Sequence, residues 1–334
     1  MRAFVLQTLD SPPVVCSVPR PCLAPGEARV RIHAAALNRR DDWIRQGAYP
    51  GLKAPIVLGS DGCGVVEQVR DADPSWIGRR VVINPSIDWG EDERVQGPDY
   101  TILGMPRDGT LAEYLCVPVE NLVEAPEHLD DNQAAALPLA GLTAWRALVT
   151  RAELVAGERV LVTGIGGGVS LVGAQLALAM GARVWVSSGS TTKIERARQL
   201  GVEGGVNYGD PEWARELRAQ CPEGFDVILD GAGGEGFGSL ARMLAPAGRL
   251  VFYGGTRGRW PRLLPQHVFF RQVSILATSM GSPTEFSAMV AFVSRVRLVP
   301  VVDRVFSLED SILSLEHLDA PERFGKVVVE MNPA

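Results

Sequence analysis

The sequence predicts an α/β protein in which a doubly wound parallel sheet is joined to a β-rich domain. Its 334 residues are enough for two domains. From about residue 130 onward, strand-like apolar runs alternate with helical patterns, which is typical of a parallel sheet covered by helices on both faces. The first 120 residues instead hold short apolar runs separated by Pro and Gly, a pattern that favours β-structure.

The first part is expected to hold four strands and one short helix, at residues 38–46. We expect residues 84–109 to be irregular and their acidic cluster to be a solvated loop. The tail, residues 301–331, returns to a strand, a short helix and a strand at 326–330, and is expected to rejoin the first domain. The four strands expected before residue 120 are 28–34, 64–69, 80–83 and 111–117.

An apolar helical stretch at residues 131–152 opens the second part and is expected to break at Gly141. Strands and helices then alternate as far as residue 295. The expected strands are 160–163, 183–187, 205–208, 226–229, 249–253 and 274–278. The expected helices are 168–180, 191–200, 211–220, 236–245 and 283–295.

The most specific signal is a glycine-rich turn between the strand at 160–163 and the helix that follows it. Glycines let the backbone turn tightly and approach a ligand closely, and the N–H groups at the start of a helix attract a pyrophosphate. A strand, glycine turn, helix and strand within about thirty residues is the dinucleotide-binding unit. An ordinary strand-to-helix turn is the alternative. The residues expected to bind the cofactor here are Gly164, Gly166, Gly167, Gly168 and Val169.

The end of the second strand of this unit indicates which dinucleotide binds. An NAD site is expected to have an Asp or Glu there to hold the ribose 2′-hydroxyl. This chain has Ser188 and Gly189, followed by Lys193. Hydroxyls and a cation suit a 2′-phosphate, so we expect NADPH. The alternative is that Lys193 only solvates a helix.

Composition excludes several other classes. The net charge is −6 and no basic stripe is visible, so neither nucleic acid nor an anionic membrane is an expected partner. No run of 18 apolar residues and no signal peptide is present, so we expect a cytoplasmic protein. The five cysteines are scattered without a C-x-x-C pair, which indicates neither a disulfide framework nor a thiolate zinc cluster.

Several local phrases resemble the medium-chain dehydrogenase/reductase superfamily, most closely its zinc-free quinone oxidoreductase-like members. The resemblance covers essentially the whole chain. It implies a GroES-like substrate and catalytic domain at 1–122, completed by 297–334, and a Rossmann-type NADP-binding domain at 123–296. The phrases stand at residues 59–66, 108–114, 138–145, 164–168, 230–233, 253–255 and 323–328.

Many relatives hold a catalytic zinc, and the resemblance shows what occupies its ligand positions here. Asn38, Ser60 and Ala140 stand at these positions, with Asp61 at the position of an acid. An amide, a hydroxyl and a methyl group make no tetrahedral zinc site, so no metal is expected. The structural zinc lobe of such relatives maps to residues 84–109, which contain no cysteine.

The resemblance therefore implies hydride transfer from NADPH to a small molecule, a quinone or an α,β-unsaturated carbonyl, without a metal. Asn38 and Asp41 match an Asn-x-x-Asp phrase of zinc-free relatives, and Tyr49 matches a tyrosine near the nicotinamide. Asn38 is expected to donate to the substrate oxygen, and Tyr49 to be a donor or proton source. Asp41 is expected to orient its neighbours or cap the helix. Ordinary structural roles are the alternative for all three.

Further cofactor contacts are implied in the same way. Thr143 resembles a threonine beside the nicotinamide half, although a helix threonine also bonds its own backbone. Tyr208 is expected to flank the phosphoribose or the adenine. Arg323 is expected to reach the cofactor across a cleft between the domains, with a surface salt bridge as its alternative. The glycines that follow later strands are expected at the ligand edge of the sheet: Gly231, Gly254 and Gly255.

An apolar strand at 272–279 is expected to form the edge of the sheet and to pair across a two-fold axis in a homodimer. Burial under a loop is the alternative. Two other functions stay open. One is an alcohol or aldehyde dehydrogenase of the zinc-dependent type, and the other is an NADPH-binding sensor or structural protein with little turnover.

Overall fold

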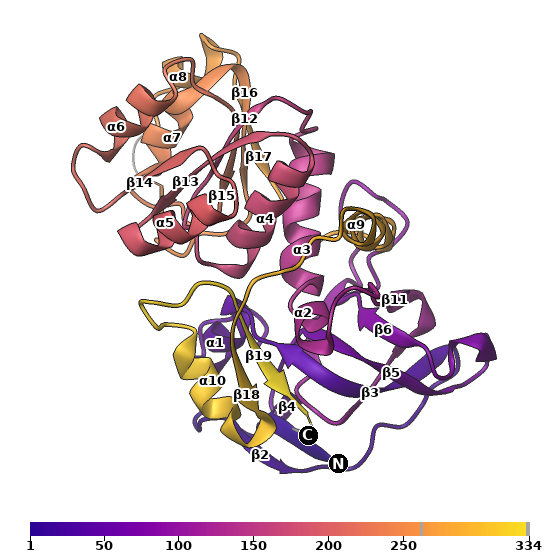
Figure 1. The fold of residues 1–334 in the computed structure, drawn as a ribbon. Coiled ribbons are helices and arrows are strands. Elements are labelled where there is room, and N and C mark those ends of the chain that lie inside the picture. The colour runs from indigo at the N-terminus through magenta and orange to yellow at the C-terminus, as the bar shows by residue number, and fades with distance from the viewer. Residues whose placement is uncertain (261–262, 332–334) are drawn as a thin grey trace. The chain divides into compact units, whose positions relative to one another are not determined.

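The computed structural model describes residues 1–260 and 263–331, and it forms two compact units (Figure 1). The first comprises residues 1–142 and the C-terminal segment from Gly281, and the second comprises Thr143–Met280. Both predicted parts of the fold class, a parallel α/β sheet and a β-rich domain, are confirmed. The unit bounds differ from the predicted 1–122 and 123–296, because α2 (Asp131–Ala135) packs on strands of the first unit.

The first unit is built around a seven-stranded sheet. Its strands follow the order β11-β6-β5-β3-β19-β18, with β10 also paired to β3. The C-terminal β19 (Lys326–Glu330) lies antiparallel to β3 (Glu27–Ala36), so the tail completes this unit as predicted. The other strands are β5 (Asp61–Val69), β6 (Arg80–Ile83), β10 (Tyr114–Pro118), β11 (Leu122–Glu124) and β18 (Val302–Ser307).

Two small sheets and several helices surround this sheet. Residues 84–109, expected to be irregular, contain a sheet of β7 (Ser86–Ile87), β8 (Thr101–Leu103) and β9 (Pro106–Arg107). These strands are too short to leave a periodic pattern among so many Gly, Pro and Asp residues. The other strands and α-helices around it are β1 (Arg2–Leu6), β2 (Val14–Ser17), β4 (Ile56–Val57), α1 (Arg39–Arg45), α9 (Pro283–Val296) and α10 (Ser311–His317).

The expected break at Gly141 is wrong. The helical stretch is interrupted earlier, between α2 and α3 (Pro138–Trp145), and a π-helical turn follows at Arg146–Arg151. Proline disfavours a helical residue before it, so Pro138 decides where the break falls. Gly141 lies inside α3 in close packing, where an added Cβ would come within 2.9 Å of the Leu137 side chain.

The second unit is a six-stranded parallel sheet with the strand order β14-β13-β12-β15-β16-β17. This order reverses direction at β12, and ligands bind in such sheets at the point of reversal. The strands are β12 (Arg159–Val162), β13 (Arg183–Ser188), β14 (Gly204–Asn207), β15 (Phe225–Asp230), β16 (Leu244–Phe252) and β17 (Ser274–Ala277). The helices are α4 (Gly168–Ala179), α5 (Thr191–Gln199), α6 (Trp213–Gln220), α7 (Phe237–Met243) and α8 (Gln266–Phe269).

The central strands of this sheet are buried on both faces, as their unbroken apolar sequence predicts. Val160, Leu161 and Val162 of β12 are fully buried. β17 stands at one edge of the sheet, where the predicted pairing of 272–279 with a second copy stays a prediction. Among the residues described, no helix is long and apolar enough to cross a membrane.

Candidate active site

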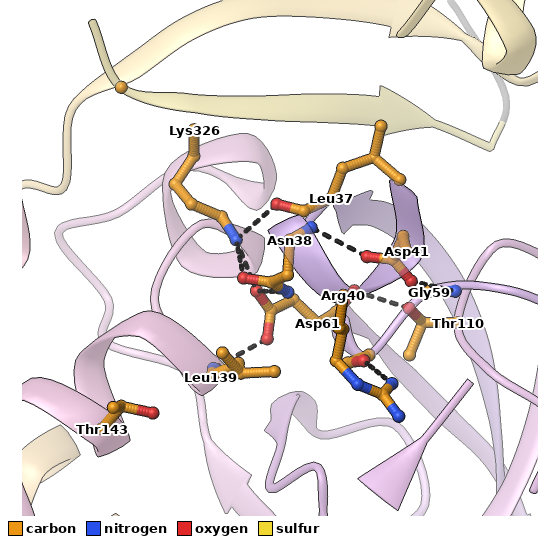
Figure 2. Close-up of polar contacts among 12 residues, drawn as sticks. Leu37, Asn38, Arg40, Asp41, Gly59, Asp61, Thr110, Leu139, Thr143 and Lys326 are labelled. Atoms are coloured by element: carbon orange, nitrogen blue, oxygen red, sulfur yellow. Dashed lines mark hydrogen bonds and ion pairs between the residues drawn. The ribbon is translucent and has the colours of Figure 1, made fainter. Parts of the chain in front are cut away.

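A buried polar cluster lies where β3 runs into α1. It consists of Asn38, Asp61 and Lys326, whose exposed fractions are 9%, 0% and 3%. The Lys326 ammonium donates to Asp61 Oδ2 and to Asn38 Oδ1, each at 2.7 Å. The Asn38 amide Nδ2 donates to the same Asp61 Oδ2 at 2.9 Å, which closes a ring of hydrogen bonds (Figure 2). We call these three residues the polar cluster.

Sheet register brings these distant residues together. Ala36, near the end of β3, faces Asp61 across the β3–β5 ladder. On its other side Ala36 faces Val328 of β19, two residues after Lys326. The cluster therefore draws one side chain from each of two strands and one from the segment that leaves β3 between them. A residue at position 326 cannot be placed beside residue 61 without this long-range pairing.

Asp61 is fixed by further bonds. Its second carboxylate oxygen, Oδ1, accepts from the Leu139 backbone N–H at 2.7 Å, and its carbonyl accepts from Thr110 Oγ1 at 2.7 Å. Leu139 lies in the first turn of α3, so the carboxylate stands at the positive end of a helix dipole. A carboxylate with this many donors is held in one orientation.

Asp41 is fully buried and faces the backbone. Its Oδ2 accepts from the Asn38 N–H at 2.8 Å, and its Oδ1 accepts from the Gly59 N–H at 3.1 Å. Burial raises the pKa of Asp41, against the lowering effects of the neighbouring Arg40 and of the bond from Asn38. With these contacts Asp41 caps the helix and orients its neighbours, as expected from the sequence. A catalytic role for Asp41 stays a prediction.

Tyr49 is held by a buried arginine that the sequence analysis did not single out. Arg40, 7% exposed, donates from Nε to the Tyr49 hydroxyl at 3.2 Å and from Nη1 to Ser60 Oγ at 2.6 Å. Its Nη2 donates to the Met105 carbonyl at 3.0 Å. Because the Tyr49 oxygen accepts from Arg40, its own proton stays available to another acceptor.

The residues at the zinc positions do not fit zinc. Asn38 Oδ1 and Asp61 Oδ2 already bind the Lys326 ammonium, and Ser60 Oγ binds the Arg40 guanidinium. Two buried cations here would repel a Zn²⁺ ion, and Ala140 supplies no ligand atom. Across residues 1–260 and 263–331, no three His, Cys, Asp or Glu side chains group as metal ligands.

In the second unit, the glycine turn after β12 forms an open backbone cradle. Gly164 and Gly166 have φ angles of 65° and 118°, which other residues rarely adopt. A Cβ added at Gly164 would meet nothing within 4 Å, so a ligand can approach this backbone. Gly167 is the N-cap of α4, and Gly168 and Val169 form its first turn, which receives no hydrogen bond from a capping side chain. The cradle fits a pyrophosphate.

Ser170 stands where relatives often have a third glycine. It is 2% exposed, and its hydroxyl lies 2.9 Å from the Gly164 carbonyl and 3.0 Å from the Gly167 carbonyl. The serine therefore packs closely and also fastens the turn, so its presence is compatible with the cradle.

The end of β13 looks different from the simplest sequence interpretation. Ser188 is 4% exposed, and its hydroxyl accepts from the Ser190 N–H at 3.2 Å. Ser190 in turn caps α5 by accepting from the Lys193 N–H at 3.4 Å. The Ser188 hydroxyl also donates to the Ile165 carbonyl at 3.4 Å, so local structure uses both its proton and its oxygen. The Ser190 hydroxyl accepts from Lys193 and keeps its own proton for another acceptor.

A cation near the end of β13 was missed by sequence reasoning. The guanidinium of Arg257, an exposed residue, lies 4.7 Å from the centre of the Tyr208 ring. Tyr208 also adjoins Gly189, where an added Cβ would come within 3.1 Å of the tyrosine hydroxyl. Arg257 follows β16 in a loop with no recognisable motif, so only the fold brings it to the end of β13.

The structure places the other predicted cofactor residues in diverse settings. The Thr143 hydroxyl is 3.9 Å from the Met280 sulfur. An added Cβ at Gly231 would come within 2.5 Å of the Tyr253 ring, and one at Gly254 within 2.9 Å of the Gly231 carbonyl, whereas Gly255 has open space around it. Arg323, in the first unit, donates to the carbonyls of Leu318 and Gly325 at 2.9 Å each. Their cofactor contacts stay predictions.

Family models match both units. Residues 24–127 match the alcohol dehydrogenase GroES-like domain, and residues 168–295 match the model described as zinc-binding dehydrogenase. With the parallel sheet and the glycine cradle, these matches define a two-domain oxidoreductase. The chain belongs to the medium-chain dehydrogenase/reductase superfamily, as the resemblance implied.

Individual relatives span the whole chain. The zinc-type alcohol dehydrogenase-like protein YogA of Leptosphaeria maculans is 36% identical over 339 residues, covering 94% of this chain and 93% of the relative. The acryloyl-coenzyme A reductase of Metallosphaera sedula is 29% identical and covers 98% of this chain and 99% of its own. A crystal structure of an NAD-dependent alcohol dehydrogenase is 39% identical, with a TM-score of 0.93 over 99% of this chain and 100% of that chain.

Proposed function

We propose that this oxidoreductase is a zinc-independent reductase that uses NADPH to reduce a quinone or an α,β-unsaturated carbonyl. The observation that carries the proposal is the polar cluster. It presents a fixed amide donor, Asn38, in the place where zinc-bearing relatives would need a metal ligand, and buried cations already bind the oxygens around it. Donors fixed before reaction stabilise a developing oxyanion without reorganisation.

Asn38 is the residue that meets the substrate oxygen in this proposal. Its Nδ2 carries two hydrogens, and among the described residues Asp61 is the one acceptor for them. The second hydrogen is thus available to an oxygen that gains negative charge. Reduction of a conjugated carbonyl delocalises that charge over an enolate, which one neutral donor stabilises more readily than a localised alkoxide.

The bound nicotinamide would supply the hydride, and the glycine cradle at Gly164 and Gly166 would hold its pyrophosphate. Tyr49 is the proposed proton donor, because its oxygen accepts from Arg40 and leaves its proton directed elsewhere.

The preference for NADPH rests on charge at the end of β13. No Asp or Glu stands between Ser188 and Lys193, Lys193 lies at the start of α5, and the Arg257 guanidinium lies over the Tyr208 ring. The relative described as NAD-dependent is 39% identical, so the phosphate preference needs its own test.

The test is a panel of quinones, enones and aldehydes, each offered with NADPH and with NADH, followed by absorbance at the nicotinamide band. We expect turnover of quinones or enones, with a KM for NADPH about tenfold or more below that for NADH. Turnover confined to aldehydes would refute the substrate class. Equal KM values for the two nucleotides would refute the cofactor preference separately.

A further inference from the structure

Lys326 is a buried lysine whose ammonium makes three hydrogen bonds. It donates to the Leu37 carbonyl, to Asn38 Oδ1 and to Asp61 Oδ2, each at 2.7 Å. An ammonium has three hydrogens, so every donor is used. Lys326 therefore has no hydrogen left for a substrate, and its effect on a reaction must pass through its partners (Figure 2).

Its first effect is on the orientation of the Asn38 amide. The oxygen and nitrogen of an amide have nearly the same shape, so hydrogen-bond partners decide which way it faces. Lys326 only donates and an ionised Asp61 only accepts. The ammonium therefore selects Oδ1 and the carboxylate selects Nδ2, which leaves one Nδ2 hydrogen in a defined direction.

Its second effect is on charge. Asp61 is fully buried, and the Lys326 ammonium is in contact with its carboxylate. Without that cation, a buried negative charge would stand 2.9 Å from the amide nitrogen that is to stabilise another negative charge. The ammonium cancels this repulsion.

We propose that Lys326 is a positioning residue, a cation built into the chain that orients Asn38 and neutralises Asp61 in the place of a metal. This inference rests on the proposed function, since it names how the donor for that reaction is held. It assigns the lysine no contact with substrate. The competing interpretation is that Lys326 has a purely structural role and only holds β19 against β3; we call this role a structural pin.

The chain is well suited to a test because it has three lysines: Lys53, Lys193 and Lys326. We would compare Lys326→Met with Lys53→Met, a control at an exposed lysine. Folding would be checked by circular dichroism and cofactor binding by calorimetry. We expect Lys326→Met to keep its affinity for NADPH and to lose about 10–100-fold in kcat, the usual effect of removing an outer-shell partner.

A spectroscopic readout separates positioning from pinning. In wild-type protein labelled with ¹⁵N-asparagine, the Asn38 side-chain amide should give one slowly exchanging pair of signals, identified by its absence from Asn38→Ala. In Lys326→Met this pair should broaden or exchange rapidly while the other asparagine signals stay in place. An unchanged Asn38 pair together with unchanged kcat would overturn the proposal.

A double variant covers the case in which Lys326→Met fails to fold. Asp61→Asn with Lys326→Met removes both charges, so stability should recover because no buried charge is left unpaired. We expect kcat to stay low in the double variant, because no cation orients Asn38. Full recovery of kcat would show a structural pin and overturn the proposal. If wild-type protein reduces no quinone or enone, the proposed function fails, and the amide signals still decide whether Lys326 positions Asn38.

Discussion

The polar cluster of the first unit and the glycine cradle of the second solve opposite problems. In the cluster, side chains satisfy one another: Lys326 uses all three hydrogens, and Asp61 accepts through both carboxylate oxygens. In the cradle, the glycines carry no side chain, and a Cβ added at Gly164 would meet no other atom within 4 Å. The polar cluster holds one hydrogen-bond donor in a fixed orientation, whereas the cradle leaves room for a ligand beside its backbone.

This difference predicts different kinds of damage. A substitution in the cluster leaves a buried charge or donor without its partner, so it should affect stability or turnover. A substitution around the cradle removes part of a binding surface that the folded protein does not need, so it should affect nucleotide affinity. Variants that mix the two effects would break the comparison.

The largest effect is expected from Asp61→Ala. It leaves the Lys326 ammonium buried without its carboxylate, which typically costs about 3–5 kcal/mol of unfolding free energy. Urea denaturation measures this. Glu309→Ala is the control, because Glu309 pairs with Arg2 at the surface, where both side chains are 44% exposed or more and a salt bridge contributes about 0–1 kcal/mol. Equal losses in the two variants would contradict the account.

Asn38→Ala should come next. Removing one donor to a developing oxyanion typically lowers kcat by about 10²–10³-fold. The dissociation constant for NADPH should not change, because the cradle belongs to the other unit. Asn132→Ala is the matched control, since Asn132 is an asparagine of the same unit whose amide donates to Glu330 at 2.7 Å outside the cluster. A loss of nucleotide affinity without loss of kcat would contradict the account, because it would mean that Asn38 contributes to nucleotide binding and not to the reaction.

A smaller effect is expected from Arg257→Ala. A charge-assisted hydrogen bond contributes about 1.5–3 kcal/mol, and exposure of Arg257 should keep the loss of NADPH affinity near about tenfold. NADH affinity should stay the same, because it has no 2′-phosphate. Calorimetry with both nucleotides measures the difference. Arg259→Ala, an exposed arginine two residues further, should leave both affinities unchanged.

The smallest effect concerns an ion pair away from both regions. Arg159 Nη2 donates to Asp226 Oδ1 at 2.8 Å. Both residues lie near the starts of their strands, β12 and β15, whereas the cradle follows the end of β12. Burial raises the pKa of Asp226, but the hydrogen bonds from Arg159 outweigh it and lower the pKa below its usual range. The stabilisation is therefore present above the unfolded pKa of about 3.9 and is lost as the pH falls through the lower folded value.

Asp226→Asn should accordingly reduce the unfolding free energy at neutral pH, and its difference from wild type should shrink as the pH falls below about 4. Nucleotide affinity should not change. Denaturation curves across this range measure the effect, with the exposed Asp10→Asn as control. If the difference in unfolding free energy between the two proteins grew as the pH fell, the prediction would be contradicted.

The cradle can be predicted from the sequence more readily than the polar cluster, for a physical reason. A strand, a glycine turn and a helix are contiguous, so Gly164 and its neighbours can be recognised within about thirty residues. Asn38, Asp61 and Lys326 come together only through the pairing of β3 with β5 and with β19. Resemblance indicated Asn38 and Asp61. Lys326 lies within the phrase at 323–328, but no role could be assigned to it, because nothing in the local sequence shows which carboxylate it contacts.

Other differences have equally local causes. Pro138 rather than Gly141 breaks the helix, because an N-terminal proline restrains the residue before it while a glycine inside a packed helix is tolerated. Arg40 was overlooked because an arginine in a predicted helix is usually exposed. Here its guanidinium reaches Ser60 and Met105 within the first unit.

The most direct test of the central claim measures turnover and metal content on the same purified sample. The protein would be treated with a strong chelator, analysed for zinc and assayed with NADPH and a reducible quinone or enone, before and after zinc is added back. The account predicts the same kcat at every zinc content, with the activity lost in Asn38→Ala. A kcat that rises in proportion to bound zinc would contradict it.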